Sequence, residues 1–117
     1  MLLNNKNIKI VIIAMLLSII PFYCNAQTRV VSCPTTFSDN HRIYHISNAS
    51  LFDGKITDNV ELVPEFKKNE AIWSIDSKIE PYLVCKYAGT RHYIVLYAKG
   101  ASYCQISEAP IQANCMR

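Results

Sequence analysis

The sequence predicts a mainly β fold, a small single-domain antiparallel sandwich or incomplete barrel with two disulfides and at most one short helical turn. Three observations favour this fold. The chain has 117 residues, 50% hydrophobic and 18% charged, which suits a single core and is too apolar for a disordered chain. Short runs of β-branched and aromatic residues are separated by turn residues. The cysteines after residue 26 form an even set, as in small exported domains with disulfides.

The N-terminal segment 1–26 has the three parts of a secretory signal peptide. Two lysines give it a positive start, Ile10 to Ile20 form an eleven-residue apolar run, and Cys24-Asn25-Ala26 offers small residues for cleavage. As a helix the run would reach about 17 Å, too short for a hydrocarbon core of about 30 Å. Lipid attachment at Cys24 is disfavoured because the preceding Tyr23 is large. We therefore expect a cleaved signal peptide, one β domain over 27–117, and no membrane span after cleavage.

Signal cleavage changes both the charge and the cysteine count. The mature chain has 10 basic and 9 acidic residues and a net charge near +1, which argues against a dedicated nucleic-acid binder. Its four cysteines are Cys33, Cys85, Cys104 and Cys115. They include no C-x-x-C pair, and their spacings of 52, 19 and 11 residues match no common zinc module, so two structural disulfides are predicted.

The C-terminal half predicts a four-stranded meander, with strands at 82–87, 93–98, 102–107 and 112–116. The run 93–98 is apolar without a break, which predicts a central strand covered on both faces. In the first strand, Leu83, Cys85 and Tyr87 share one face. The predicted turns lie at Gly89, Gly100 and Ala109-Pro110, and glycine supplies the positive φ that a hairpin needs.

Strand signals before residue 80 are weaker. They cover 29–33, 42–47, 50–52 and 71–75. Asp53-Gly54 is a strong turn pair. Asp58 and Glu61 have the spacing of a capping box, which predicts a short helical turn ended by Pro64.

Four cysteines allow three pairings, and the predicted meander restricts them. It places Cys85 and Cys104 on strands two apart, at about 9.6 Å, beyond the roughly 7 Å that a disulfide allows. Cys104 and Cys115 lie symmetrically about Ala109-Pro110, almost opposite each other. We therefore expect a Cys104–Cys115 disulfide, and a Cys33–Cys85 disulfide that pins the N-terminal strand to the meander.

Residues with catalytic or metal-binding chemistry do not assemble in the sequence. His41 and His45 are four apart, which suits a metal on a helix, but on the predicted strand this spacing is about 13 Å. His92 and Asp39 could join them only through a contact made by the fold. Two carboxylate pairs fit solvated turns better than a catalytic site; they are Asp53 with Asp58 and Glu61 with Glu65. We therefore predict no catalytic residues, no metal, no cofactor and no enzymatic activity.

Tyrosine is the residue type that best suggests a binding surface. Six of the seven tyrosines follow residue 26, and tyrosine suits interfaces because it combines apolar area with a hydroxyl. The competing interpretation, a good strand residue with one solvated end, is the one we favour. Trp73, between Ile72 and Ile75, is expected to pack in the core or at its rim.

Several motifs occur together along the mature chain. They are Phe52-Asp53-Gly54, Leu62-Val63-Pro64, Trp73-Ser74-Ile75 and the segment 82–90 with its Cys-x-Tyr-x-Gly-Thr core. With an opening Cys33-Pro34 and two closing cysteines, they resemble a family of small exported proteobacterial proteins of uncharacterised function. The resemblance covers 30–117 and is weakest over 35–50. It implies periplasmic export and a disulfide-bonded β domain, and it carries over no catalytic residues.

Two functions from different classes follow. The first is a non-enzymatic periplasmic binding protein that inhibits or neutralises a cell-wall-acting enzyme or toxin, as an immunity protein or a lysozyme inhibitor does. Its partner would be another periplasmic protein, an exported hydrolase or toxin, and a rigid scaffold would lower the entropic cost of binding it. The alternative is a structural or accessory envelope protein with no enzyme target. The interface would come from the turns around Asp53-Gly54 and Lys99-Gly100, or from 39–45.

Overall fold

The computed structural model describes residues 28–117. The predicted signal peptide and its cleavage site lie outside these residues. Within 28–117, no helix is long and apolar enough to cross a membrane. The described chain is almost entirely β, with nine strands and one 3-10 turn, so the predicted fold class is confirmed.

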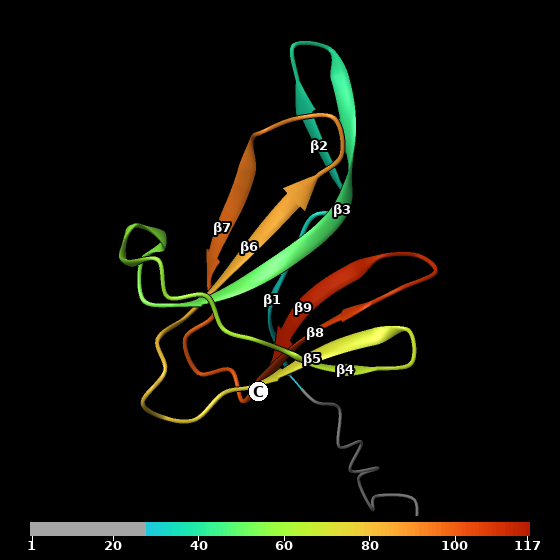
Figure 1. Cartoon of the computed structure of the whole chain (residues 1–117). Helices are drawn as coiled ribbons and strands as arrows, with labels where there is room; N and C mark the ends of the chain where they lie inside the picture. Colours follow the sequence, from blue (N-terminus) through green and yellow to red (C-terminus); the bar gives the residue numbers. More distant parts are fainter. Residues whose placement is uncertain (1–27) are drawn as a thin grey trace, which may run out of the picture.

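The strands form two antiparallel sheets (Figure 1). The larger sheet has the order β1 (Arg29–Ser32), β9 (Gln112–Met116), β8 (Tyr103–Ser107), β5 (Glu70–Ser74) and β4 (Glu65–Lys67). The smaller sheet has the order β2 (Thr36–Asp39), β3 (Arg42–Asp53), β6 (Pro81–Tyr87) and β7 (Tyr93–Tyr97). β1 also contacts β7, so the sheets approach each other on that side and form an incomplete barrel.

The core lies between the two sheets. β6 is the most buried strand, with Leu83 and Cys85 fully buried and Tyr87 nearly so, on the shared face that the sequence predicts. Leu51 of β3 joins them from the same sheet, and Trp73 of β5 from the other. The core position predicted for Trp73 is therefore confirmed.

The predicted four-stranded meander is wrong at its centre. β6 pairs with β7 and β8 pairs with β9, but β7 and β8 belong to different sheets. Gly89, with φ of 84°, makes the predicted hairpin turn between β6 and β7. After β7 the Ala101 amide donates a hydrogen bond to the Ala98 carbonyl at 3.1 Å, and the chain crosses to the other sheet. The turn residues predict a tight turn there, but they carry no signal for a change of sheet.

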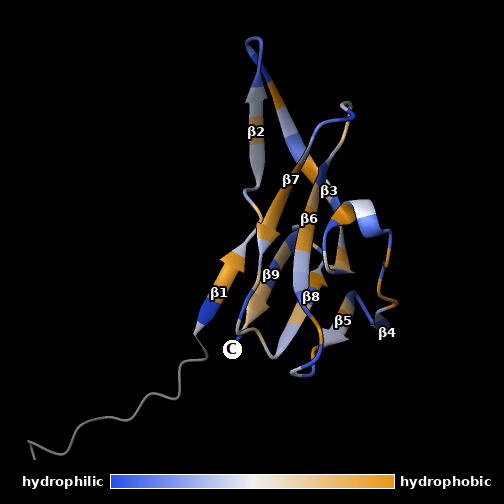
Figure 2. Cartoon of the chain, turned by 90° about the vertical axis from the view of Figure 1, so that its left-hand side faces the viewer, coloured by the Kyte–Doolittle hydropathy of each residue, from blue (hydrophilic) through white to orange (hydrophobic). Residues whose placement is uncertain are grey.

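β7 is an edge strand and not the central strand that its apolar run predicts. Among the described strands it pairs only with β6, and its residues alternate between exposed and half-buried. Tyr93, Val95 and Tyr97 face solvent, whereas Ile94 and Leu96 pack against the core. Figure 2 shows the resulting hydrophobic strand at the sheet edge. The run is apolar throughout because β-branched and aromatic residues suit a strand even where one face meets water.

Both disulfides pair as expected, Cys33 with Cys85 and Cys104 with Cys115. The first joins the two sheets, since Cys33 follows β1 and Cys85 lies in β6, with Cα atoms 5.7 Å apart. The second lies within the larger sheet, where Cys104 of β8 is directly opposite Cys115 of β9. The predicted geometry that excluded a Cys85–Cys104 disulfide is wrong. These two cysteines lie in different sheets, and not on two strands separated by a third.

The segment before β6 differs most from the prediction. β3 is one strand of 12 residues where the sequence predicts two, at 42–47 and 50–52. β2 and β4 are not predicted, since each is only four or three residues long and lacks an alternating pattern. The 3-10 turn η1 (Ile56–Asp58) ends at Asp58 instead of beginning there, and its N-cap residue Lys55 makes no side-chain cap. The capping-box prediction is therefore misplaced by about one turn.

Candidate functional site

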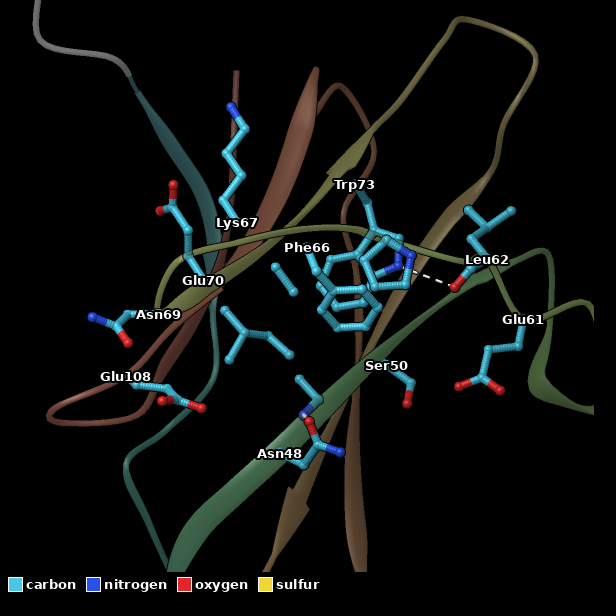
Figure 3. Close-up of a pocket in the computed structure, with 14 residues that line it drawn as sticks. Asn48, Ser50, Glu61, Leu62, Phe66, Lys67, Asn69, Glu70, Trp73 and Glu108 are labelled. Atoms are coloured by element: carbon cyan, nitrogen blue, oxygen red, sulfur yellow. Dashed lines mark hydrogen bonds between the residues drawn. The ribbon is translucent and has the colours of Figure 1, made fainter.

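A groove lies between β3 of the smaller sheet and β4 and β5 of the larger sheet (Figure 3). It is open to solvent and has a volume of about 380 Å³. By strand order, this is the side of the barrel away from the β1–β7 contact. The lining residues come from the segments 48–50, 61–73 and 106–108.

Part of the groove lining is apolar and firmly held. Trp73, Leu62 and Ile106 contribute to it, and Trp73 is 5% exposed. The Trp73 indole N–H donates a hydrogen bond to the Leu62 carbonyl at 3.0 Å (dashed in Figure 3). The Leu62 amide in turn donates to the Leu51 carbonyl of β3 at 2.8 Å. Leu62 is therefore tied to both sheets, and this wall of the groove has a defined position.

The charged lining residues are mostly carboxylates. They are Glu61, Glu70, Glu108 and Lys67. The three glutamates come from separate places, namely before β4, at the start of β5 and after β8. Among residues 28–117, none of the three carboxylates takes part in an ion pair or a side-chain hydrogen bond. The groove therefore has excess negative charge, in a domain whose overall charge is near +1.

Exposed apolar side chains stand beside this groove. Phe66 lines it and is 77% exposed, and Val63, between the lining residues Leu62 and Pro64, is 88% exposed. These are the largest exposed fractions among the large hydrophobic residues of the described chain. Apolar side chains gathered at a concave surface mark interaction sites more often than scattered ones do.

A second surface is the outer face of β6 and β7, which we call the tyrosine face and define as Tyr82, Tyr93, Val95 and Tyr97. Tyr82 lies opposite Tyr97 in the sheet, and their rings stack with centroids 4.7 Å apart. The Tyr97 hydroxyl donates a hydrogen bond to the Glu80 carboxylate at 3.3 Å. Desolvation, and then the negative charge of Glu80, raise the pKa of the Tyr97 phenol. Tyrosine therefore occurs both at the surface and in the core of the described chain, since Tyr93 and Tyr97 are exposed whereas Tyr87 is buried.

The interface positions proposed from the sequence lie outside the groove. The Asp53 carboxylate is used structurally, because it accepts a hydrogen bond from the Glu80 amide at 2.9 Å. Lys99 and Gly100 line a second open hollow, of about 510 Å³. The segment 39–45 lies at the tip of the β2–β3 hairpin, which projects from the body of the domain (Figure 1). They remain proposals for other contact surfaces.

The histidines do not converge on one site. His92 Nε2 lies 3.6 Å from Asp39 Oδ2, which is the contact that the sequence left open. His41 lies in the turn between β2 and β3, and His45 lies within β3. Within 28–117, no group of three histidine, cysteine, aspartate or glutamate side chains is placed to hold a metal ion.

The groove is the feature that the sequence does not predict. Its walls are brought together by sheet pairing from segments far apart in the chain. The sequence lets Glu61 be interpreted as a capping-box residue or as a solvated turn residue, and Phe66 lies in a strand too short to recognise. Trp73 is the one lining residue whose buried position the sequence predicts, and it lies in β5.

One comparison with known proteins gives a match. The family model described as Type VI secretion system Tli immunity protein matches residues 38–116. No curated protein and no solved structure matches the chain. The matched segment contains every lining residue of the groove and three of the four cysteines. It begins after Cys33-Pro34, so the Cys-Pro motif and a proteobacterial origin stay predictions.

Proposed function

The chain belongs to the type VI secretion system Tli immunity protein family, and we propose that it neutralises its toxin effector by direct, non-catalytic binding in the periplasm. The family match over 38–116 is the observation that carries this proposal. An immunity protein neutralises a toxin effector, so the match favours the first function expected from the sequence over an accessory envelope protein. The compartment, the binding mode and a cell-wall-acting toxin are the proposed parts.

The architecture supports neutralisation by binding. Two disulfides cross-link 90 described residues, and the cysteines of both are buried. A scaffold held in this way loses little conformational entropy when it binds, which improves affinity without new contacts. The groove and the tyrosine face both offer aromatic and polar groups of the kind that protein interfaces use.

The cysteines and the N-terminal segment support a periplasmic location for the protein. Disulfides persist in oxidising compartments and are rare in a reducing cytosol. The segment 1–26 has the sequence pattern of a cleaved signal peptide. An immunity protein located there would meet a toxin that acts on the cell envelope, which is the target class we propose.

The test begins with the full chain, carrying a C-terminal tag and expressed in its own organism. Protein purified from the periplasmic fraction without reductant is expected to bring down one exported toxin in a 1:1 complex. That toxin, exported alone in a sensitive host, should stop growth, and co-expression of the full chain should restore it. A chain lacking residues 2–26 should not protect.

Each part of the proposal has its own contrary result. Absence of any toxin from the purified complex, or growth arrest despite co-expression, would contradict neutralisation by binding. Full protection by the chain lacking residues 2–26 would contradict the periplasmic site. Turnover of the toxin, seen as cleaved or modified product, would contradict a non-catalytic mechanism.

A further inference from the structure

We propose that the groove between β3 and β4–β5 binds a cationic segment of the toxin effector, with a lysine or arginine side chain inserted between the carboxylates. The inference rests on the proposed function and goes further, because it names the docking surface and the chemistry of the bound segment. The aliphatic stem of the inserted side chain would lie on the apolar lining, and its charged end would reach the glutamates.

The shape and lining of the groove suit such a side chain. Its volume of about 380 Å³ lies near the lower end of the range for ligand sites, roughly 300 to 1,000 Å³. Leu62, Trp73 and Ile106 supply apolar contact, while the glutamates supply charge. Lysine and arginine are the side chains that combine a long apolar stem with a charged end.

The charge of the groove selects a cation. Glu61, Glu70 and Glu108 line it with one basic residue, Lys67, and have no ion-pair partner among residues 28–117. Carboxylates gathered in a concave surface make the electrostatic potential there negative and raise the local concentration of positive groups. The low dielectric of the walls strengthens this attraction. Because the domain as a whole is near +1, this negative charge is local to the groove and is not a property of the whole surface.

Polar side chains complete the lining on the β3 side. Asn48 and Ser50 line the groove there, and Figure 3 shows Ser50 on β3, between Asn48 and the side that carries Glu61. Among the described residues, no side-chain nitrogen or oxygen atom is both buried and without a hydrogen-bond partner. The Ser50 hydroxyl adds a group that can accept a hydrogen bond from a cationic segment.

The exposed apolar residues extend the contact beyond the inserted side chain. Phe66 and Val63 are 77% and 88% exposed at and beside the groove. A bound segment that passes over them would remove that apolar surface from water, which favours association. The tyrosine face lacks this combination, because its neighbouring carboxylate, Glu80, already accepts a hydrogen bond from the Tyr97 hydroxyl.

The test compares two double charge reversals in the full chain. Glu70→Lys with Glu108→Lys reverses the groove, and Asp58→Lys with Asp76→Lys makes the same change in net charge at positions outside it. The probe is the toxin recovered with the tagged chain, purified on its own. Affinity is measured by calorimetry at two salt concentrations, and the thermal midpoint of each variant verifies folding. The neutral pair Glu70→Gln with Glu108→Gln serves if the reversed pair unfolds.

The groove variant is expected to raise Kd at least thirtyfold, as loss of a desolvated charge pair does, while the control stays within threefold. Binding by the unsubstituted chain should weaken with salt, and binding by the groove variant should depend less on salt. Unchanged affinity of the groove variant would overturn the inference and leave the proposed function standing. A further double variant, Tyr93→Ala with Tyr97→Ala, tests the tyrosine face. Loss of binding in this variant alone would place the interface there and would also overturn the inference. An unsubstituted chain that does not bind would overturn both.

Discussion

The two sides of the incomplete barrel are joined in different ways. On one side β1 contacts β7, the Cys33–Cys85 disulfide links the sheets, and the Tyr87 hydroxyl reaches across to the segment after Cys33. On the other side β3 meets the larger sheet through the segment around Leu62, held by hydrogen bonds that include the Trp73 indole. The first side is closed, and the second is left open as the groove.

This difference shows how a small domain can keep an open binding surface. A chain of about 90 residues is only marginally stable on its core alone, so an unfilled groove with unpaired carboxylates is a cost that must be offset. The covalent link on the closed side offsets it by restricting the unfolded chain. The closed side therefore supplies stability, and the open side is free to serve binding.

The largest effect is expected from breaking the closed side. Replacing Cys33 and Cys85 by serine should lower the free energy of unfolding by about 4 kcal/mol, because this disulfide closes a loop of 52 residues. Urea denaturation followed by tryptophan fluorescence measures the change. A loss below about 1 kcal/mol would show that the β1–β7 contact holds this side without the covalent link.

A second disulfide variant separates loop closure from the joining of sheets. Replacing Cys104 and Cys115 by serine should cost about 3 kcal/mol, since the loop of 11 residues is shorter and the bond lies within one sheet. The same urea experiment applies, with toxin affinity measured on the folded protein. Affinity should be retained, because the groove walls do not depend on this bond. A greater loss of stability than for Cys33 and Cys85 would contradict the comparison.

The open side is probed by Trp73→Phe. The smaller ring loses the hydrogen bond to the Leu62 carbonyl and leaves space in a site that is 5% exposed, so a loss of about 2 kcal/mol is expected. Tyrosine fluorescence or circular dichroism follows unfolding in this variant. Toxin affinity should fall as well, since Leu62 then loses one of its ties. Unchanged affinity would show that Leu62 is positioned by the Leu51 hydrogen bond alone.

The sequence predicts those features of the fold that depend on local patterns, and it misses those that depend on contacts between distant segments. The fold class, the disulfide pairing and the buried face of β6 follow from local patterns and cysteine spacing. The change of sheet after β7 was missed, because a turn that joins two sheets has the same residues as one that joins two paired strands. The groove was missed since its charges, Glu61, Glu70 and Glu108, meet only after β4, β5 and β8 have paired.

The smallest expected effect is on the closed side and depends on pH. The buried Tyr87 hydroxyl donates a hydrogen bond to the Pro34 carbonyl at 2.7 Å, so Tyr87→Phe should cost about 1 kcal/mol at pH 7. Burial raises the pKa of this phenol, so the folded state holds the proton more tightly than the unfolded chain does. The stability that Tyr87 contributes is therefore fully present below the unfolded pKa of about 10 and is lost as pH rises through the folded value.

The difference in unfolding free energy between the unsubstituted protein and Tyr87→Phe should thus shrink above about pH 10, because phenylalanine does not titrate. Comparing the two proteins cancels the lysines that titrate in the same range. Tyr93→Phe is the matched control: its side chain is 54% exposed, so the unfolding free energy at pH 7 should stay near that of the unsubstituted protein. A difference for Tyr87→Phe that stays constant to pH 11 would show that the pKa of the phenol is the same in the folded and the unfolded chain, which would contradict the effect of burial.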